Sequence, residues 1–492
     1  MLSQTSEADS DLTGLIYSGL FKYNGEGKIE NDLADDYEIS EDQKTYTVRL
    51  KKNIFWHDGR PLTASDVFFT VSILQDPAYK SPLRQNWQGI GVNQIDDYTL
   101  SFNLNNPYFG FFSNLTVGIL PKHIWENITP EKFSLADYNL KPIGSGPYEF
   151  VNFQKNSNGE ILAYNLRAFG KYFKDEPYIS QITFNFYPDE DRMLAAYNKK
   201  EIKGMENINP EKIPNIKNKK TTAIRELSFP RYFAIFLNQN KSIPLANDEV
   251  RKALAYSVDR GEIINKVLYG KGAEIYAPFL SSMDEYNNDS EKKDFNIDEA
   301  NKILDEAGWK FKEGETVKEK NGTKLQFKIY TTDWPDLSET ANILAKQWQN
   351  VGADVIVDVL SVSDLQQNFI RPREYEALLF GQDSSFNPDL YPFWHSSQKQ
   401  DGFNLGMLDN KDADAILQNI KQEPDSGRRV ELYREFQKIL AKENSAIFIY
   451  SPYYLYPISS DIKGFETTRV NSPSWRFSDI NKWYIKTTRV RK

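Results

Sequence analysis

Three histidines and several acidic runs are the residues of this sequence whose types suit catalysis. His57, His123 and His395 lie far apart along the chain, and none stands in a metal-ligand spacing such as H-E-x-x-H. Gly144-Ser145-Gly146 does not match the G-x-S-x-G turn, and there is no P-loop or dinucleotide fingerprint. Acidic runs such as Asp189-Glu190-Asp191 are common at the solvated starts of helices, so a carbohydrate-active hydrolase with two carboxylates would rest on composition alone. The sequence therefore predicts no catalytic residue, no metal and no cofactor.

Composition narrows the class of protein further. A chain of 492 residues is too long for one hydrophobic core, so we expect two or three domains. The net charge of −9 and the lack of a basic stripe argue against a nucleic-acid partner, and the absence of cysteine excludes disulfides and thiolate metal sites. No stretch approaches the roughly 18 apolar residues of a membrane-spanning helix. We expect a soluble mature form whose leader has been removed, because residues 1–20 resemble no signal peptide.

The central stretch 231–240 is the element on which we expect the chain to be organised. Six of its first seven residues are apolar, too continuous for a strand with one wet face, and Asn238-Gln239-Asn240 then ends it with turn formers. We interpret it as a buried strand that passes from one lobe into another. Its side chains would then border whatever lies between the lobes.

Alternation and capping signals predict the other elements. Strands are expected at 46–50, 98–104, 148–153, 161–167, 181–187, 325–329, 355–359 and 446–450. Helices are expected at 9–20, 63–73, 190–198, 247–267, 296–307, 338–349, 410–420 and 427–442. The segment 325–359 is therefore a βαβ unit with parallel strands. Residues 379–395, rich in aromatic and polar side chains, are interpreted as a long irregular binding loop.

Several motifs in this order resemble one protein family. They are Tyr46-Thr47-Val48-Arg49-Leu50, the block from Trp56 to Val67 (WHDGRPLTASDV), Gly144-Ser145-Gly146-Pro147-Tyr148, Asn247 to Leu254 (NDEVRKAL), Val258-Asp259-Arg260 and Ala307-Gly308-Trp309. The sequence is similar over nearly its whole length to the family 5 extracellular solute-binding proteins of ABC importers, which include oligopeptide- and dipeptide-binding proteins. The block from Trp56 is the most specific of these matches.

The resemblance implies an α/β fold of two lobes, the periplasmic-binding-protein-like fold of type II, cluster C, with an extra α+β subdomain on the N-terminal lobe. Lobe I would be discontinuous, formed by residues 1–24, 149–235 and 452–492. The extra subdomain would span residues 25–148, and lobe II residues 236–451. The ligand would lie in a cleft between the lobes.

The resemblance also implies which residues contact the ligand. In the family these come from the loop before the first helix, from the strand that enters the second lobe and from the loop before an Asn/Asp-Pro motif, where an aspartate of the peptide-binding members pairs with the ligand α-amine. An alignment can place either Asp383 or Ser384 at that aspartate, because the spacing to Pro388 departs from the family pattern. The expected contacts are Thr5, Ser6, Glu7, Arg231, Tyr232, Phe233, Gly381, Gln382, Asp383 and Ser384.

Each of these residues also has a plain structural interpretation. Asp383 can offset the desolvation of an ammonium group or cap a turn through an Asx motif. Arg231 can pair with a ligand carboxylate or with a surface acid. Tyr232 and Phe233 face opposite ways along a strand, so one of them is expected to pack in the core. Trp87 and Trp394 are candidates for stacking on the ligand or for core packing.

The resemblance implies a receptor without catalytic activity that captures peptides and delivers them to the permease subunits of an ABC importer. We expect a monomer outside the cytoplasm, in the periplasm or on the outer face of the membrane, anchored through a lipid-modified leader. Oligosaccharides, nickel chelates and signalling peptides are alternative ligands, because one fold serves many functions. A hydrolase is the alternative from a different class.

Overall fold

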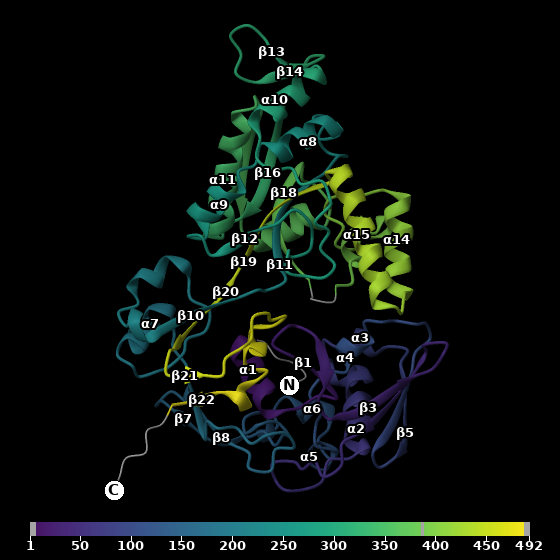
Figure 1. The fold of residues 1–492 in the computed structure, drawn as a ribbon, viewed down its shortest axis with the longest axis vertical. Helices are drawn as coiled ribbons and strands as arrows, with labels where there is room; N and C mark the ends of the chain where they lie inside the picture. The colour runs from purple at the N-terminus through teal and green to yellow at the C-terminus, as the bar shows by residue number, and fades with distance from the viewer. Residues whose placement is uncertain (1–5, 385–387, 487–492) are drawn as a thin grey trace. The chain divides into compact units, whose positions relative to one another are not determined.

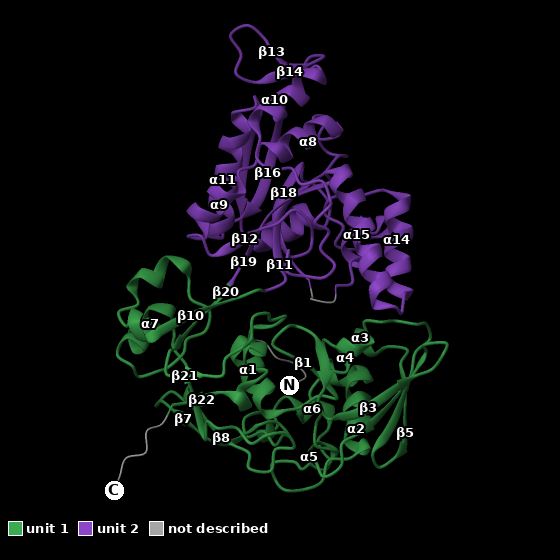
Figure 2. Cartoon of the chain, viewed as in Figure 1, with its two compact units in different colours: residues 1–228, 454–492 green, residues 229–453 purple. Residues whose placement is uncertain are grey.

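The computed structural model describes residues 6–384 and 388–486, and the chain forms two compact units (Figure 1). Unit 1 comprises residues 1–228 and 454–492, and unit 2 comprises residues 229–453 (Figure 2). The chain therefore enters unit 2 after Ser228 and returns to unit 1 after Tyr453. Both units combine helices with sheets, as the predicted α/β class requires.

Unit 2 is built on a six-stranded mixed sheet in the order β12-β19-β11-β18-β16-β17. The strands are β12 (Gly272–Glu274), β19 (Ala446–Pro452), β11 (Arg231–Leu237), β18 (Ala377–Asp383), β16 (Gln326–Thr332) and β17 (Asp354–Leu360). β16 runs parallel to β17 and to β18, and α11 (Pro335–Gln349) connects β16 to β17. The predicted βαβ unit is confirmed. Its helix begins at Pro335 rather than Ser338, since proline is well placed in a first turn, where its missing N–H has no partner to lose.

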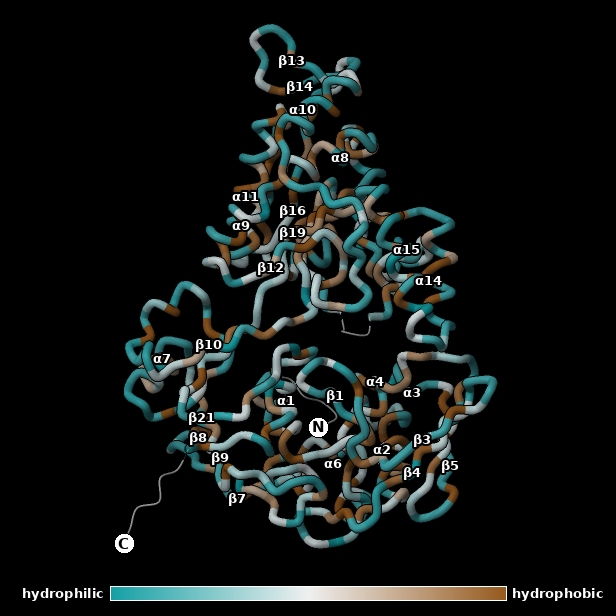
Figure 3. The backbone as a smooth tube through the Cα atoms, viewed as in Figure 1, coloured by the Kyte–Doolittle hydropathy of each residue, from teal (hydrophilic) through white to brown (hydrophobic). Residues whose placement is uncertain are grey.

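β11 lies inside this sheet, hydrogen-bonded on both sides. It pairs antiparallel with β18 and with β19, and six of its seven residues are buried. Phe233, Ile235 and Leu237 share a core with the apolar face of α11, and hydrophobic segments run along the central strands (Figure 3). The predicted buried strand is confirmed. The sequence placed the lobe boundary after residue 235, whereas the structure keeps the whole strand in unit 2, because its pairing with β18 begins at Arg231.

The helices of unit 2 follow the capping signals with one correction. The single helix predicted over 247–267 is wrong: α8 (Asp248–Tyr256) ends before Ser257, and Asp259 caps a new helix, α9 (Arg260–Val267), by accepting from the N–H of Glu262. The helices predicted at 296–307, 410–420 and 427–442 are confirmed as α10 (Ile297–Glu306), α14 (Lys411–Gln422) and α15 (Ser426–Glu443). The short elements of this unit are α12 (Val362–Asp364), α13 (Tyr391–Trp394), β13 (Lys310–Phe311), β14 (Lys318–Lys320) and β15 (Thr323–Lys324).

The long irregular loop predicted over 379–395 is also corrected. Its first part belongs to β18, which continues to Asp383, and its last part forms α13. β18 extends to Asp383 because it stays paired with β11 as far as Arg231. Residues 385–387 of the predicted loop lie outside the described residues.

Unit 1 contains a four-stranded antiparallel sheet in the order β3-β4-β6-β5 and a three-stranded sheet β7-β8-β9. Its strands are β1 (Phe21–Tyr23), β2 (Ile29–Asn31), β3 (Ala34–Ile39), β4 (Thr45–Leu50), β5 (Gly91–Asp96), β6 (Thr99–Asn103), β7 (Tyr148–Lys155), β8 (Ile161–Ala168), β9 (Gln181–Asn185), β10 (Thr222–Leu227), β20 (Tyr454–Ser459), β21 (Ile462–Lys463) and β22 (Tyr484–Ile485). Its helices are α1 (Glu7–Ile16), α2 (Ala64–Gln75), α3 (Arg84–Trp87), α4 (Phe111–Asn114), α5 (Lys122–Trp125), α6 (Pro130–Phe133) and α7 (Glu190–Asn198). The helix predicted over 63–73 is confirmed as α2, and its start is capped by Asp66 Oδ2, which accepts from the N–H of Thr63 at 2.9 Å.

Two of the motifs that carry the resemblance, the block from Trp56 and the segment Gly144-Ser145-Gly146-Pro147-Tyr148, meet at His57. Its Nδ1 accepts from the N–H of Gly144 at 3.2 Å, and its Nε2 donates to the carbonyl of Gly146 at 3.1 Å. These two bonds require a neutral ring with its proton on Nε2, because a protonated ring could not accept from Gly144. Burial lowers the pKa of His57 from 6.5 to about 4. His57 is thus a structural residue that holds the segment 144–146 by hydrogen bonds.

This structural role of His57 predicts a pH dependence of stability. Because the pKa of His57 is about 4 in the folded protein and about 6.5 in the unfolded chain, its contribution is fully present above pH 6.5 and is lost as the pH falls to 4. We expect the free energy of unfolding to drop by about 3 kcal/mol over that window from this residue alone. Urea unfolding at several pH values would measure the drop in wild type and in His57→Gln. An equally steep fall in the variant would contradict the assignment.

Candidate ligand site

Two charged residues predicted as ligand contacts lie side by side at one edge of the unit 2 sheet, the edge formed by the ends of its strands. Arg231 begins β11 and Asp383 ends β18, and the two are directly opposite in the register. Arg231 Nε donates to Asp383 Oδ1 at 2.5 Å, and a second guanidinium nitrogen donates to Oδ2 at 3.0 Å. Their side chains are 41% and 57% exposed, so solvent reaches both. The pair therefore offers a carboxylate and a guanidinium at one accessible point.

The residues that flank this ion pair hold the two strands together. Ser384 donates from its main-chain N–H to the Pro230 carbonyl at 2.7 Å and from Oγ to the same atom at 3.0 Å. On the opposite face of the strands, Tyr232 donates its hydroxyl proton to Gln382, and Gln382 Nε2 donates to the Phe403 carbonyl at 3.1 Å. Both side chains are buried, and burial raises the pKa of Tyr232 above its ordinary range. Tyr232 and Gln382 are thus packing residues of unit 2, on the face of the strands opposite the ion pair.

Phe233 and Gly381 face each other across the strand pair. The Phe233 ring is 9% exposed and lies 5.2 Å from the ring of Tyr450. A Cβ atom placed on Gly381 would come within 2.6 Å of the Phe233 ring, so glycine leaves the space that this ring occupies. Phe233 lies on the same face of the strand as Arg231 and supports that face from below.

The two candidate tryptophans lie in hydrophobic cores. Trp394 is fully buried in unit 2, with ring centroids 6.2 Å from Phe236 and 5.8 Å from Phe448. Trp87 is 2% exposed in unit 1 and packs against Phe102 and Phe111. Core packing therefore accounts for both side chains, and the proposed site does not include them.

The N-terminal candidates belong to unit 1. Thr5 lies outside the described residues. Ser6 caps α1 by accepting from the N–H of Asp9 at 3.1 Å, and Glu7 is the first residue of that helix. α1 is anchored by Asp11, which forms a buried ion pair with Arg476. The local structure thus fixes where the chain enters α1.

Sequence reasoning missed a tryptophan at the same sheet edge as Arg231 and Asp383. Trp334 follows β16 and directly precedes α11, and it is 51% exposed. β16 runs parallel to β18, with Tyr330 opposite Leu378, so Trp334 follows β16 at the same end of the sheet at which β18 ends. The available signal was a strand ending in Asp333-Trp334-Pro335-Asp336, where a proline starts a helix immediately after a tryptophan.

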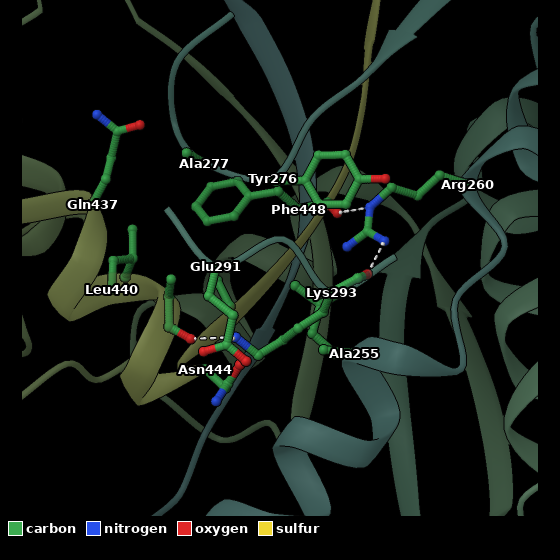
Figure 4. Close-up of a pocket in the computed structure, with 13 residues that line it drawn as sticks. Ala255, Arg260, Tyr276, Ala277, Glu291, Lys293, Gln437, Leu440, Asn444 and Phe448 are labelled. Carbon is green, nitrogen blue, oxygen red and sulfur yellow. Dashed lines mark hydrogen bonds and ion pairs between the residues drawn. The ribbon is translucent and has the colours of Figure 1, made fainter. Parts of the chain in front are cut away.

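Unit 2 also contains a small cavity of about 30 Å³ that shares no residue with this edge (Figure 4). Arg260 donates to the carbonyl oxygens of Phe448 at 2.8 Å and Lys293 at 3.2 Å, and Lys293 Nζ donates to that of Ala441 at 2.6 Å. Burial lowers the pKa of both cations. Each cation is used to satisfy main-chain carbonyls, so the cavity has a structural role.

Over residues 6–384 and 388–486, no three His, Asp or Glu side chains gather as a metal site would require. No helix in the described part of the chain has the length and apolar content needed to cross a bilayer.

Comparison with known proteins connects this chain to a family. The sequence model of the bacterial extracellular solute-binding proteins, family 5 (middle region), matches residues 28–404. The oligopeptide-binding protein AppA of Bacillus subtilis is 28% identical over 496 residues, covering 98% of this chain and 89% of that protein. The dipeptide-binding protein of Escherichia coli is 26% identical and covers 92% of this chain and 86% of its own length. The nickel-binding protein NikA of Staphylococcus aureus is 23% identical, covering 91% and 86%.

Solved structures agree with the sequence comparison. The structure of AppA from Bacillus subtilis in complex with a nonapeptide matches with a TM-score of 0.71 and 27% identity, covering 99% of this chain and 96% of that one. A putative peptide-binding AppA from Clostridium difficile matches with a TM-score of 0.82 at 24% identity, covering 98% and 99%. The second match shows the fold alone, which is the two-lobed α/β fold of this family.

Proposed function

We propose that this chain, which belongs to the family 5 bacterial extracellular solute-binding proteins, captures peptides and delivers them to the permease subunits of an ABC importer. The relatives named for oligopeptides and dipeptides support a peptide ligand. The observation on which the proposal rests is the Arg231–Asp383 pair, two opposite charges that remain open to solvent at the edge of the unit 2 sheet. Peptides carry an ammonium and a carboxylate, the two groups that such a pair can bind.

The remaining features of the predicted receptor belong to the same proposal. The chain acts without catalysis, cofactor or nucleic acid, as a monomer outside the cytoplasm, held at the membrane through a lipid-modified leader. The two lobes are taken to be unit 1 (residues 1–228 and 454–492), which includes the subdomain 25–148, and unit 2 (residues 229–453), and the permease would recognise the ligand-bound state of the receptor. Main-chain hydrogen bonds would make such binding tolerant of peptide sequence.

Asp383 is proposed to anchor the ligand α-amine. Both of its carboxylate oxygens accept from Arg231, so an incoming ammonium would share or replace this guanidinium. Because charge-assisted hydrogen bonds contribute about 1.5–3 kcal/mol, Asp383→Ala should weaken binding of peptides with a free amine by about 10- to 100-fold. N-acetylated peptides should lose much less.

Isothermal titration calorimetry with matched free and N-acetylated peptides measures this difference. Glu374→Ala is the control, because it removes an exposed carboxylate from another ion pair of unit 2, Lys241–Glu374, and should leave both affinities unchanged. Equal losses for the two kinds of peptide in Asp383→Ala would remove the amine-anchor role while leaving peptide capture intact.

Nickel chelates are the second candidate ligand, because a nickel-binding relative covers nearly the same length of chain as the peptide-binding ones. Calorimetry with nickel–histidine complexes, oligosaccharides and mixed peptides, alongside a turnover assay with oligosaccharides, separates the ligand classes. Peptide binding without turnover is the expected result. Catalytic turnover, or no peptide binding at all, would overturn the proposed function.

A further inference from the structure

Unit 1 carries a basic surface patch on a chain whose net charge is −9. The patch lies where the end of α7 meets the start of β10 (Figure 1), and there the Tyr197 hydroxyl donates to Thr222 Oγ1 at 3.0 Å. Two segments supply its exposed lysines, the residues that follow α7 and the residues that precede β10. We name them the lysine patch: Lys199, Lys200, Lys203, Lys217, Lys219 and Lys220.

Asn198, the last residue of α7, joins these two segments. Its Oδ1 accepts from the N–H of Lys217 at 2.7 Å, and its Nδ2 donates to the Asn215 carbonyl at 3.1 Å. The Asn198 carbonyl in turn accepts from Nδ2 of Asn218 at 3.0 Å. The main-chain positions of the lysines are therefore held next to one another, although the lysines come from separate stretches of the sequence.

Most of the positive charge of the lysine patch has no acid to balance it. Lys199 pairs with Glu201 at 3.9 Å and Lys203 with Asp461 at 3.4 Å, and all four side chains are more than half exposed. Such exposed pairs contribute little and exchange readily with other partners. Across residues 6–384 and 388–486, no carboxylate pairs with the ammonium groups of Lys200, Lys217, Lys219 and Lys220.

The other acids of this region do not cancel the charge of the patch. Glu190 and Asp191 lie at the opposite end of α7, about 10–12 Å away at a rise of about 1.5 Å per residue. Lys212 pairs with both of them, at 3.2 Å and 2.7 Å. Since screening at physiological ionic strength acts over about 8 Å, a surface that touches the patch responds mainly to the lysines and little to the net charge of the chain.

The composition of the lysine patch indicates what kind of surface it fits. All its cations are lysines, which are hydrated point charges on flexible stems, whereas arginine provides a planar fork for one carboxylate or phosphate. Protein interfaces are poor in lysine and rich in aromatic residues, and single-stranded nucleic acids bind where aromatic rings stack on the bases. In the described chain, no large hydrophobic side chain is exposed between residues 179 and 242. The patch therefore fits a surface whose negative charge is spread out and needs no shape-matched contact.

We propose that the lysine patch docks unit 1 on the anionic lipid headgroups of a membrane. Each lysine that comes close to such a surface adds to the attraction, and six of them can do so together. Because the contact is electrostatic and excludes no apolar area, it is reversible and depends on salt. Docking is a property of unit 1, so it goes beyond peptide capture and does not depend on the Arg231–Asp383 pair of unit 2.

The test measures sedimentation of the full chain with sucrose-loaded vesicles. Vesicles of phosphatidylcholine with about one third phosphatidylglycerol should bind the protein at least about tenfold more tightly than pure phosphatidylcholine at about 0.1 M salt, and about 0.5 M salt should remove the difference. The double variant Lys217→Glu/Lys220→Glu should lose this tenfold preference. Its peptide affinity, measured by calorimetry, should equal that of wild type.

Lys310→Glu/Lys438→Glu is the matched control, because it changes the net charge equally at two exposed lysines of unit 2 and should keep the preference for anionic vesicles. Circular dichroism would establish that both variants are folded. Equal binding to neutral and anionic vesicles, or an equal loss in the two variants, overturns membrane docking while peptide capture stands. Tighter binding of single-stranded DNA than of anionic vesicles, lost in Lys217→Glu/Lys220→Glu, would assign the patch to nucleic acid and also overturn it. Failure of wild type to bind peptides would overturn the proposed function and leave docking intact.

Discussion

Arg476→Met is expected to lower the free energy of unfolding by about 3–5 kcal/mol, because it leaves the carboxylate of Asp11 buried without its partner. Asp11 and Arg476 are 4% and 3% exposed, and a guanidinium nitrogen of Arg476 donates to Asp11 Oδ1 at 2.8 Å. The same nitrogen donates to the Pro473 carbonyl at 2.7 Å, and the guanidinium lies 4.3 Å from the ring of Phe477. The pair fixes α1 to the segment Pro473–Phe477.

Urea unfolding followed by circular dichroism would measure this loss. Arg428→Met is the control, since Arg428 forms an exposed pair with Glu431 at 2.6 Å, and exposed pairs contribute at most about 1 kcal/mol. The double variant Asp11→Leu/Arg476→Met should recover part of the loss, because no unpaired charge then remains buried. A single variant as stable as Arg428→Met would show that the pair does not hold α1.

Gly144→Ala is expected to destabilise unit 1 by about 3 kcal/mol or more through overpacking. A Cβ atom on Gly144 would lie 1.9 Å from the carbonyl oxygen of Ile16 at the end of α1. A main-chain atom cannot rotate away, so the segment 144–146 would have to shift, and its hydrogen bonds to His57 would be strained. The N–H of Gly146 also donates to Ile16 at 2.8 Å, so this contact would be lost as well.

Thermal unfolding of Gly144→Ala, compared with Gly14→Ala, would check this expectation. Gly14 lies on the exposed face of α1, and a Cβ atom added there would be 4.0 Å from its nearest neighbour, the Cβ of Ser474. Alanine at this position should therefore stabilise the protein by about 0.5–1 kcal/mol. Two glycine substitutions near the same helix thus have opposite expected signs. A Gly144→Ala protein that melts with wild type would mean that the close approach to α1 relaxes at no cost.

Much of the fold followed from signals a few residues long. Thr63 and Asp66 at the start of α2, Asn296 at the start of α10, and the alternation of β16 and β17 each locate an element by local chemistry. The error over 247–267 has a non-local cause. Arg260 turns inward to donate to the carbonyls of Phe448 and Lys293, and the chain breaks at Ser257 so that Asp259 can cap a second helix.

The candidate site, like the fold, was predictable from local sequence only in part. A resemblance in sequence pointed to Arg231 and Asp383, yet each was given two alternative partners, because a side chain does not specify what stands opposite it. Their pairing across 152 residues depends on the antiparallel register of β11 and β18. Burial of Trp87 and Trp394 and exposure of Trp334 likewise depend on neighbours distant in the chain.

The sequence by itself determined the class of this protein, the capped helices and alternating strands, and the segments from which a ligand site could be made. Those features depend on hydrogen bonds and side-chain spacing within a few residues. Only the tertiary structure decided that Arg231 and Asp383 hold each other and that Trp334 stands at their sheet edge. Such contacts depend on strand order and register, which long-range packing sets and which no local stretch of sequence contains.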